Sequence, residues 1–442
     1  MQRSAAIVVC FVLLAAGFAA AEPDPPINGY LHEVDGTEVL HVWGSHYEMG
    51  YAYGHIKGDE IIELMHGYIL HLLPPMLYDI VHEIVPLLFV MPQPYAEEVT
   101  GMIDGMHDAG ADTFIPSLGR QFDAADLLLC NAVGDIGAMG CSTQVAWGDA
   151  TAAEPLAGGE TVAVRNLDWT TAGPNPFLLP ERTLVVVYSP TDPPGQSVAS
   201  VTFPGYFACL SCMNESGVTA LVNIAHNGVP LWENNFTPWF VPVGIALREA
   251  MHADTGDATE LDELIAHVSR RRRSGAVAIN LAFPFDGEND PGLVLEVDNG
   301  GATPRWASDE PRLPPDVVIS TNHLRKLREA EKCRRYETMI DGIDRLDGQM
   351  TLADMWAIEA AVVQDYFLST TVQTMYFLPH RREMGVSFSA DGVYSPFIEP
   401  SVLTWDDLSE LPAGVDIDDD DEEPDAVEDE DDDADAGCGA PN

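Results

Sequence analysis

The sequence predicts an α+β protein in which antiparallel sheets are packed between helices. The chain from about Tyr47 to Cys130 has mainly helical patterns. After Cys141, short β-branched runs are separated by Gly, Pro and Asp, and the few helical patterns occur in pairs between them. Helices that are grouped rather than alternating one by one with strands favour layered antiparallel sheets.

The helical half contains one very apolar stretch. Ile61, Ile62, Leu64 and Met65 show helical spacing, and the apolar run from Leu72 to Met91 follows them. That run is broken by Pro74–Pro75, Asp79, His82–Glu83 and Pro86. A transmembrane span needs about 20 predominantly apolar residues. We therefore favour a buried helix pair or the apolar wall of a pocket over a membrane span.

The second half of the chain predicts the strands and helices of the core. Strands are expected at 145–147, 161–164, 183–188, 197–203, 276–281, 292–297 and 317–321. A hairpin is expected over Cys209 to Ile224, and a strand pair over Thr371 to Phe388. Helices are expected at 243–252, 260–268, 329–343 and 352–363.

The two ends of the chain predict export and an acidic tail. Arg3, the apolar run Ala5–Leu14 and the small residues Ala19–Ala21 have the pattern of a signal peptide. Fifteen acidic residues lie between Asp416 and Asp435 in a segment with too little apolar surface to fold. We therefore divide the chain into a signal peptide (1–21), a mainly helical segment (22–140), a core (141–410) and a disordered acidic tail (411–442), and expect a secreted, periplasmic or cell-surface protein.

Charge restricts the possible partners. The formal net charge is −50, from 71 acidic and 21 basic residues. Such a surface repels nucleic acid and anionic membranes, so neither is an expected partner. Calcium capture or display by the acidic tail remains open.

The cysteines do not predict a disulfide framework. Six of the seven remain after removal of the signal peptide, which is few for an exported chain of this length. Cys209 and Cys212 are expected to be core thiols or one disulfide. No histidine, cysteine and carboxylate spacing predicts a metal, because His82–Glu83 lacks a second histidine four residues later.

Two short blocks suggest nucleophilic catalysis. Cys141 follows Gly140 at the start of the strand-rich half, and Arg165 and Asp168 lie on the next predicted strand. Each has an ordinary explanation: Cys141 as a small core residue, Arg165 and Asp168 as a structural ion pair. Their spacing of three residues would need a turn or bulge for both to face the same way.

The blocks resemble those of a known family, the autoproteolytic acyltransferase/hydrolases, whose namesake is isopenicillin N acyltransferase. The choloylglycine hydrolases and penicillin V acylases are more distant relatives. The resemblance runs in order from about Val42 to Phe388, and its blocks are Gly44–Gly54, Met139–Thr143, Val164–Trp169, Met213–Gly217 and Ser320–His323.

The resemblance implies a four-layer αββα fold of the N-terminal-nucleophile hydrolases and self-cleavage between Gly140 and Cys141. Cys141 would then be the nucleophile and its new α-amino group the base. Asp168 would orient that amine, and Arg165 would support the thiolate or contact substrate. The side-chain amides of Asn214 and Asn322 would stabilise the oxyanion, although Asn214 is also an ordinary turn residue. Arg382, or its neighbour Arg381, would match a late arginine that supports substrate binding.

The expected function is therefore cleavage of a C–N amide bond in an N-acyl small molecule or peptide through an acyl-enzyme on Cys141. No cofactor is expected, and acyl transfer remains an alternative to hydrolysis. A phospholipase B-like lipid esterase and an inactive surface binding protein are the competing hypotheses. A cysteine–histidine pair with His226 or His323 is disfavoured, because the flanking signatures of that class are missing.

Overall fold

The structure, a computed structural model, describes residues 27–136, 140–229, 238–253, 261–271, 273–366 and 369–415, with residue 417. The predicted signal peptide and most of the predicted acidic tail lie outside the described residues.

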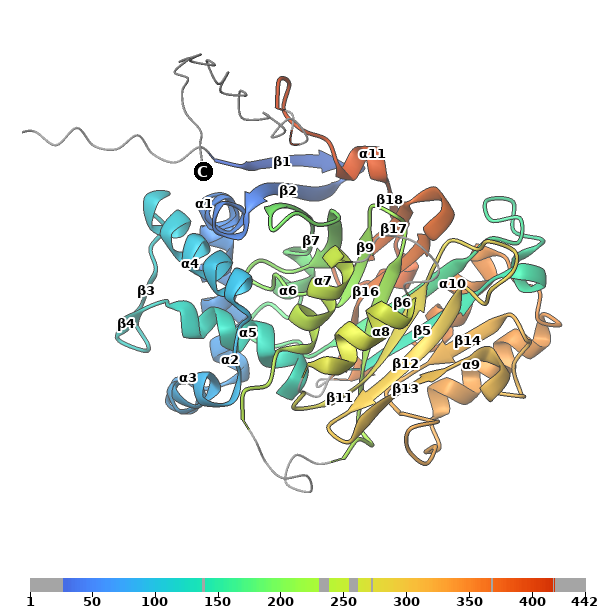
Figure 1. The fold of residues 1–442 in the computed structure, drawn as a ribbon. Coiled ribbons are helices and arrows are strands. Elements are labelled where there is room, and N and C mark those ends of the chain that lie inside the picture. Colours follow the sequence, from blue (N-terminus) through green and yellow to red (C-terminus); the bar gives the residue numbers. More distant parts are fainter. Residues whose placement is uncertain are drawn as a thin grey trace, which may run out of the picture.

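Two large sheets form the centre of the protein (Figure 1). The larger sheet has nine strands in the order β1 (Gly29–Val34), β2 (Thr37–Ser45), β7 (Leu184–Asp192), β8 (Val198–Thr202), β9 (Ser211–Asn214), β10 (Thr219–Ala225), β11 (Ala276–Ala282), β12 (Gly292–Asp298) and β13 (Gly301–Arg305). All neighbours in it are antiparallel except β2 and β7.

The second sheet has seven strands. Its order is β14 (Val317–Ser320), β5 (Gly140–Ala146), β6 (Val162–Trp169), β16 (Ser369–Leu378), β17 (Glu383–Phe388) and β18 (Ser401–Thr404), with β15 (Asp365–Tyr366) paired to β16. All of its described pairs are antiparallel. A separate small hairpin joins β3 (Phe114–Ile115) and β4 (Arg120–Gln121).

Helices cover the outer face of each sheet (Figure 1). The nine-stranded sheet packs against helices that include α1 (His46–Leu64), α4 (Gln93–Asp108), α5 (Ala124–Ile136), α7 (Val243–Ala253) and α8 (Leu261–Arg270). A π-helix, η1 (Met65–Ile69), and the short α2 (Leu70–Leu72) continue α1, and α3 (Pro75–Leu88) and α6 (Leu178–Glu181) lie on the same side. The seven-stranded sheet packs against α9 (Arg334–Arg345) and α10 (Leu352–Ala361), and α11 (Trp405–Leu408) follows β18.

Alternation along the strands explains this layering. On β6, Val162 and Val164 pack against α9 and α10, whereas Ala163 joins the core between the sheets. On β12, Leu293 and Leu295 pack under the other helices and Val294 faces the second sheet. Because successive side chains of a strand point to opposite faces, strands buried on both sides carry two apolar rows. The predicted α+β class and the four αββα layers are confirmed.

The helical segment before Cys141 is built into the core. Its first two strands, β1 and β2, were not expected from the sequence, and they form the edge of the nine-stranded sheet beside β7. The two parts of the chain on either side of Gly140–Cys141 therefore share one sheet.

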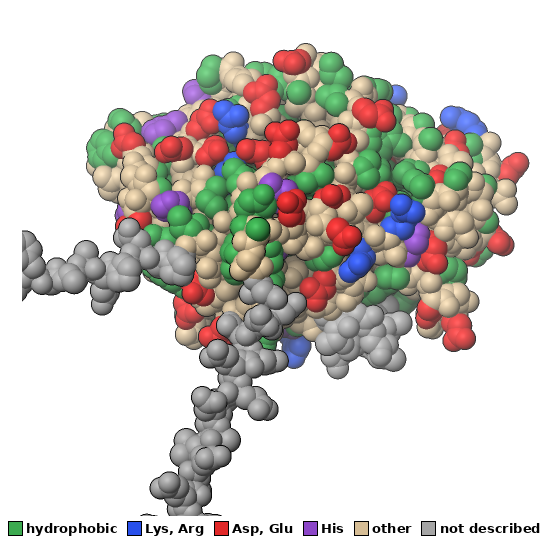
Figure 2. Space-filling model, turned by 90° about the horizontal axis from the view of Figure 1, so that it is seen from above, with side chains coloured by type: hydrophobic (Ala, Val, Ile, Leu, Met, Phe, Trp, Pro, Cys, Tyr) green, Lys and Arg blue, Asp and Glu red, His purple; other side chains and the backbone are tan. Residues whose placement is uncertain are grey.

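The apolar run from Leu72 to Met91 is not the buried pair predicted from the sequence. Helix α3 buries Tyr78, His82 and Val85, while Met76 and Leu87 are 80% and 66% exposed. Among the described residues, no helix has the length and apolar character that crossing a membrane requires. Acidic side chains are spread over the face seen in Figure 2, where basic ones are fewer. Cys209 and Cys212 form a disulfide.

Helices α1 and α4 run side by side in the same direction, and their backbones approach unusually closely. Glycines of each helix lie against backbone of the other: Gly50 against Glu98, Gly54 against Met102, Gly101 against Tyr47 and Gly105 against Tyr51. A Cβ atom at Gly54 would lie 1.9 Å from the Met102 carbonyl oxygen. Only glycine permits this approach.

We predict that Gly54→Ala destabilises the protein by about 2 kcal/mol or more, because a methyl group there must push the two helix backbones apart. Gly58→Ala on the same helix is the control: its Cβ would meet the flexible Met106 side chain at 3.0 Å. The better helix propensity of alanine, worth about 1 kcal/mol, offsets that contact. Urea unfolding compares the two variants, and equal midpoints would contradict the tight crossing.

Candidate active site

Cys141 lies at the centre of a buried polar cluster where strands of both sheets meet. It is the second residue of β5, which pairs with β6 without interruption from Gly140 opposite Asp168 to Ala146 opposite Val162. Its side chain is fully buried. Thr143, on the same face of β5, donates a hydrogen bond to Asn223 of β10, so this face is turned toward the nine-stranded sheet.

Arg165 contacts the Cys141 thiol from β6. Its Nη2 lies 3.2 Å from Sγ and also donates to the Val222 carbonyl at 2.9 Å. Its Nη1 donates to the Leu210 carbonyl and to Ser211 Oγ at 2.5 and 2.9 Å. The guanidinium is fully buried, and within the described residues it forms no ion pair with a carboxylate. Its positive charge is therefore directed at the sulfur without a permanent negative partner.

Asp168 lies on the opposite face of β6. One of its carboxylate oxygens accepts a hydrogen bond from Thr371 of β16 at 2.6 Å, and the other pairs with Arg335 of α9 at 2.5 Å. The carboxylate is fully buried. Thr371 and Arg335 thus hold Asp168 from two elements whose part in the site the sequence pattern does not indicate.

Asn322 links the backbone of Cys141 to α9 and to β10. Its side-chain oxygen accepts the Cys141 backbone N–H at 3.1 Å and also accepts a hydrogen bond from Arg335. Its Nδ2 donates to the Ile224 carbonyl of β10 at 2.7 Å. In this arrangement Asn322 binds the nitrogen of Cys141, a contact that differs from the oxyanion role expected from the sequence.

The structure corrects two sequence-based interpretations of Arg165 and Asp168. They need no turn or bulge between them, because β6 is continuous and places them on opposite faces. The local irregularity lies in β16, between Thr371 and Gln373. They are also not a structural ion pair, because Asp168 pairs with Arg335 while Arg165 contacts carbonyls and the thiol.

Two predicted residues are not brought to Cys141. Asn214 lies in the turn between β9 and β10, where its side chain accepts from Val218 N–H and donates to the Met251 carbonyl. Its neighbour Met213 pairs with Thr219 of β10. Asn322, which binds the Cys141 nitrogen, contacts Ile224 instead, and Ile224 lies roughly 16 Å along β10 from Thr219 at strand spacing.

Arg382 is exposed in the turn between β16 and β17, beside the Glu215 carbonyl. This turn is at the end of β16 opposite Thr371. Neither Asn214 nor Arg382 is therefore part of the cluster described here.

Gly140 has no room for a side chain. A Cβ atom there would lie 2.8 Å from Gln364 Nε2 and from Ser369 Oγ, and 2.9 Å from the Asp168 carboxylate. The Gly140–Cys141 peptide bond is thus surrounded by polar groups, with the Cys141 thiol on one side and Asp168 close to Gly140 Cα.

Burial controls the charge state of the thiol. Removal from water raises the pKa of Cys141, the charge of Asp168 raises it further, and the charges of Arg165 and Arg335 lower it. The thiol is therefore neutral in the intact chain. Arg165, which contacts the sulfur directly, favours the thiolate and so lowers the pKa of the thiol.

An apolar cavity lies at the same end of β6. Trp169, which follows Asp168, lines it together with Phe203, Tyr206 and the helical segment α1–η1, including Ile61, Leu64, Met65, Tyr68 and Ile69. A π-helix such as η1 is often found at a functional site. The apolar wall expected from Leu72–Met91 is thus supplied by the preceding helices.

Glu359 of α10 lies behind the cluster, on the helix-facing side of β5. Its carboxyl group accepts hydrogen bonds from Ser142 Oγ at 2.5 Å and Gln144 Nε2 at 3.2 Å. Burial raises the pKa of Glu359 to about 8. It is therefore protonated at neutral pH in the folded protein.

The raised pKa of Glu359 predicts how the stability of the protein depends on pH. The folded-state pKa of Glu359 lies above its ordinary value of 4.5. The protonated carboxyl group therefore contributes its full stabilisation of the folded state below pH 4.5, and this stabilisation is lost as the pH rises to about 8. Glu359→Gln removes this titration. We expect the wild type to lose stability relative to the variant between these pH values, at about 1.4 kcal/mol per pH unit at most. Urea unfolding from pH 5 to 9 measures the difference; parallel curves would contradict it.

One group of side chains has metal-like spacing. His82, Asp123 and Asp126 have ligand atoms within 4.8 Å of one another. Both oxygens of Asp126 already accept hydrogen bonds from the Arg120 guanidinium, at 2.7 and 2.8 Å, and Tyr78 donates to one of them. The group is an ion-pair network that connects α3 with α5, and we assign no metal to it.

Comparison with known proteins gives distant similarities. No family model matches the chain. An uncharacterized protein of Archaeoglobus fulgidus is 25% identical over 366 residues, which cover 72% of this chain. This chain spans 56% of the length of that relative.

Three solved structures resemble the fold in part. An N-acylethanolamine-hydrolyzing acid amidase ortholog from Caenorhabditis elegans has 18% identity and a TM-score of 0.40, over 60% of this chain and 99% of that chain. A mutant conjugated bile acid hydrolase from Clostridium perfringens has 11% identity and a TM-score of 0.36, over 60% and 92%. Penicillin V acylase from Agrobacterium tumefaciens has 12% identity and a TM-score of 0.34, over 56% and 83%. With TM-scores below 0.5, these similarities do not assign an activity to this chain.

Proposed function

We propose that this protein is a self-cleaving cysteine hydrolase that cleaves the amide bond of N-acyl compounds. The observation that supports this most strongly is the contact between Cys141 Sγ and Arg165 at 3.2 Å. A fully buried guanidinium without a carboxylate partner is costly unless a negative charge forms beside it. A thiolate at Cys141 is the charge that this position would receive.

In the proposed first reaction the protein cuts itself. The thiol attacks the Gly140 carbonyl carbon, and the proton passes to the Cys141 nitrogen as the peptide bond breaks. Water then hydrolyses the resulting thioester, which leaves a carboxylate on Gly140 and a free α-amino group on Cys141. Glycine suits this position because the polar groups around it leave no space for a side chain.

The new amine would serve as the base for substrate. An α-amino group titrates near pH 8, so a substantial neutral fraction exists at neutral pH. Asn322 Oδ1 already accepts the N–H of this nitrogen, and the Asp168 carboxylate lies beside the preceding residue, Gly140. We propose that these two groups orient the amine so that it can take the thiol proton and deliver it to the leaving amine.

The acyl half of the substrate is proposed to be apolar. The cavity that Trp169, Phe203 and Tyr206 line adjoins the end of β6 and has an almost entirely apolar wall. It suits an aliphatic or aromatic acyl chain, and the acyl-enzyme on Cys141 would then be resolved by water. Because the N-terminal sequence predicts export, we propose that the reaction takes place outside the cytoplasm, where water is a more accessible acceptor than coenzyme A.

The test is to supply the protein with matched N-acyl amides and acyl esters of increasing chain length. We expect release of free acid from the amides, and an acyl adduct on the peptide that begins with Cys141 when the reaction is quenched early. Cys130→Ala and Cys333→Ala show whether the adduct forms instead on the other two free thiols of the described part of the chain. Preferential release from esters would favour the lipid esterase, and no release with intact binding would favour an inactive binding protein.

A further inference from the structure

The loop between β14 and α9 supplies two groups to the candidate site. It runs over residues 321–333 without regular secondary structure, carries Asn322 near its start and leads into Arg335 in the first turn of α9. Both residues bind around the nitrogen of Cys141 and the Asp168 carboxylate. A connection of this length has no internal hydrogen-bond ladder, so other elements must fix its shape.

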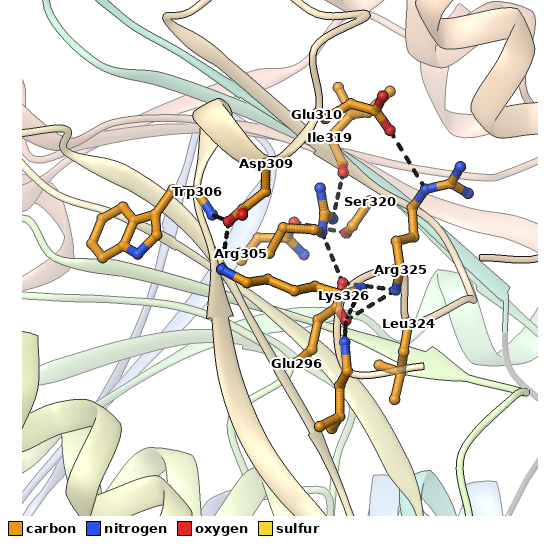
Figure 3. A network of polar contacts seen from close by, with 12 residues as sticks. Glu296, Arg305, Trp306, Asp309, Glu310, Ile319, Ser320, Leu324, Arg325 and Lys326 are labelled. Carbon is orange, nitrogen blue, oxygen red and sulfur yellow. Dashed lines mark hydrogen bonds and ion pairs between the residues drawn. The ribbon is translucent and has the colours of Figure 1, made fainter. Parts of the chain in front are cut away.

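Glu296 of β12 holds the middle of this loop (Figure 3). It is fully buried and lies on the same strand face as Val294, which is turned toward the second sheet. Its carboxylate accepts the successive backbone N–H groups of Arg325, Lys326 and Leu327 at 2.8 to 2.9 Å. Three consecutive N–H groups on one carboxylate form a nest that fixes the loop backbone.

Two further contacts extend the effect of Glu296 to both ends of the loop. Glu296 also accepts from Arg305 Nε at 2.8 Å, and Arg305 Nη2 donates to the Ile319 carbonyl of β14, just before Asn322 (Figure 3). At the other end, the Arg325 guanidinium lies 3.7 Å from the ring centre of Tyr336. Tyr336 directly follows Arg335 on α9.

We propose that Glu296 is a positioning residue of the active site: by clamping residues 325–327 it sets the places of Asn322 and Arg335 around the Cys141 nitrogen. This inference rests on the proposed function, because it assigns catalytic importance to that nitrogen. Glu296 does not touch the reacting atoms. It acts through the loop backbone and through the stacking of Arg325 on Tyr336.

The test compares Glu296→Gln with Asp298→Asn. Asp298 lies two residues later on β12, and its carboxylate binds Arg328 of the same loop at 2.6 and 2.8 Å, farther from Asn322 along the chain. Glu296 Oε2 accepts all three backbone N–H groups and Oε1 accepts Arg305 Nε, so the one amide oxygen of glutamine must leave either the loop or Arg305 facing an N–H group. We expect kcat for N-acyl amide hydrolysis to fall roughly 10- to 100-fold in Glu296→Gln, with KM within about threefold of the wild type. Asp298→Asn should keep kcat within about threefold.

A second readout does not depend on activity. In a Cys141→Ala background the chain stays uncut, and the backbone N–H of residue 141 still donates to Asn322. We expect Glu296→Gln to speed hydrogen exchange at this amide as well as at residues 325–327, and Asp298→Asn to leave residue 141 protected. If Glu296→Gln fails to fold, Arg325→Met replaces it. This variant keeps the backbone N–H groups that bind Glu296 and removes the side-chain contacts of Arg325 with Tyr336, Glu310 and the Glu331 carbonyl. The same exchange comparison applies.

The outcomes separate the two proposals. Equal loss of kcat in both variants, or rapid exchange at 325–327 with kcat and residue 141 unchanged, would overturn the positioning role. A wild-type protein that neither cuts itself nor hydrolyses N-acyl amides would overturn the proposed function, and the exchange measurement would still decide whether Glu296 controls the surroundings of residue 141.

Discussion

Replacement of Cys141 by alanine is expected to leave the protein as one chain, whereas the wild-type protein becomes two chains divided between Gly140 and Cys141. The reason is chemical: the peptide bond lies next to a single thiol, and alanine supplies no atom that can attack it. Cys141→Ser keeps a weaker nucleophile in the same place, so it should cut slowly. Intact mass and N-terminal sequencing of the second chain measure the result.

Two control variants make this experiment specific. Cys130→Ala removes a free thiol elsewhere and should cut at the wild-type rate. Gly140→Ala keeps the nucleophile but places a methyl group 2.8 to 2.9 Å from three polar atoms, so its cutting should be much slower. A wild type that remains uncut while it hydrolyses substrate would refute self-cleavage. Cutting of Cys141→Ala at the same bond would mean that another protease is responsible.

The sequence could predict the members of the site that lie in short, chemically unusual blocks. Cys141 after Gly140, and the charged pair Arg165 and Asp168 on an otherwise apolar strand, stand out because buried charges are rare. Asn322 was indicated by the family resemblance alone, because asparagine at the end of a predicted strand is otherwise an ordinary residue. The grouping of strand-like and helical segments likewise predicted the α+β class, and the resemblance implied the four layers; both are confirmed.

The other features of the site depend on three-dimensional packing, which the spacing of residues in the sequence does not reveal. Arg335 follows another arginine at the start of an amphipathic helix, which in the sequence resembles an exposed helix end. Only the packing of α9 on β14 directs it to Asp168. Asn214 shows the opposite difficulty, because asparagine in a turn and asparagine in an active site have the same local sequence. In the structure it bonds to Val218 and Met251 beside its turn. The opposite faces of Arg165 and Asp168 follow from strand geometry and could have been derived.

Replacement of Arg165 by methionine is the second change with a large expected effect. It removes the positive charge beside Cys141 and the hydrogen bonds that Arg165 donates to the Leu210 and Val222 carbonyls, although the Leu210 carbonyl keeps the Val222 N–H as a donor. Because a nearby positive charge favours the thiolate, its loss raises the pKa of the thiol. We expect kcat/KM at neutral pH to fall roughly 100-fold or more, and the unfolding free energy to fall by about 3 to 5 kcal/mol. Arg165→Lys retains the charge but lacks the planar fork, so its loss should be intermediate.

Arg248→Met distinguishes a catalytic effect from lost stability. Arg248 is also fully buried and is paired with Glu98 at 2.7 Å. Its replacement leaves that carboxylate without its arginine and should destabilise the protein to a similar extent. The thiol pKa is read from the pH dependence of iodoacetamide alkylation of Cys141 in the cut enzyme. It should move to higher pH in Arg165→Met and stay in place in Arg248→Met. If both variants shift it equally, or neither does, Arg165 does not stabilise the thiolate, and its role is to join the two sheets through Leu210, Ser211 and Val222.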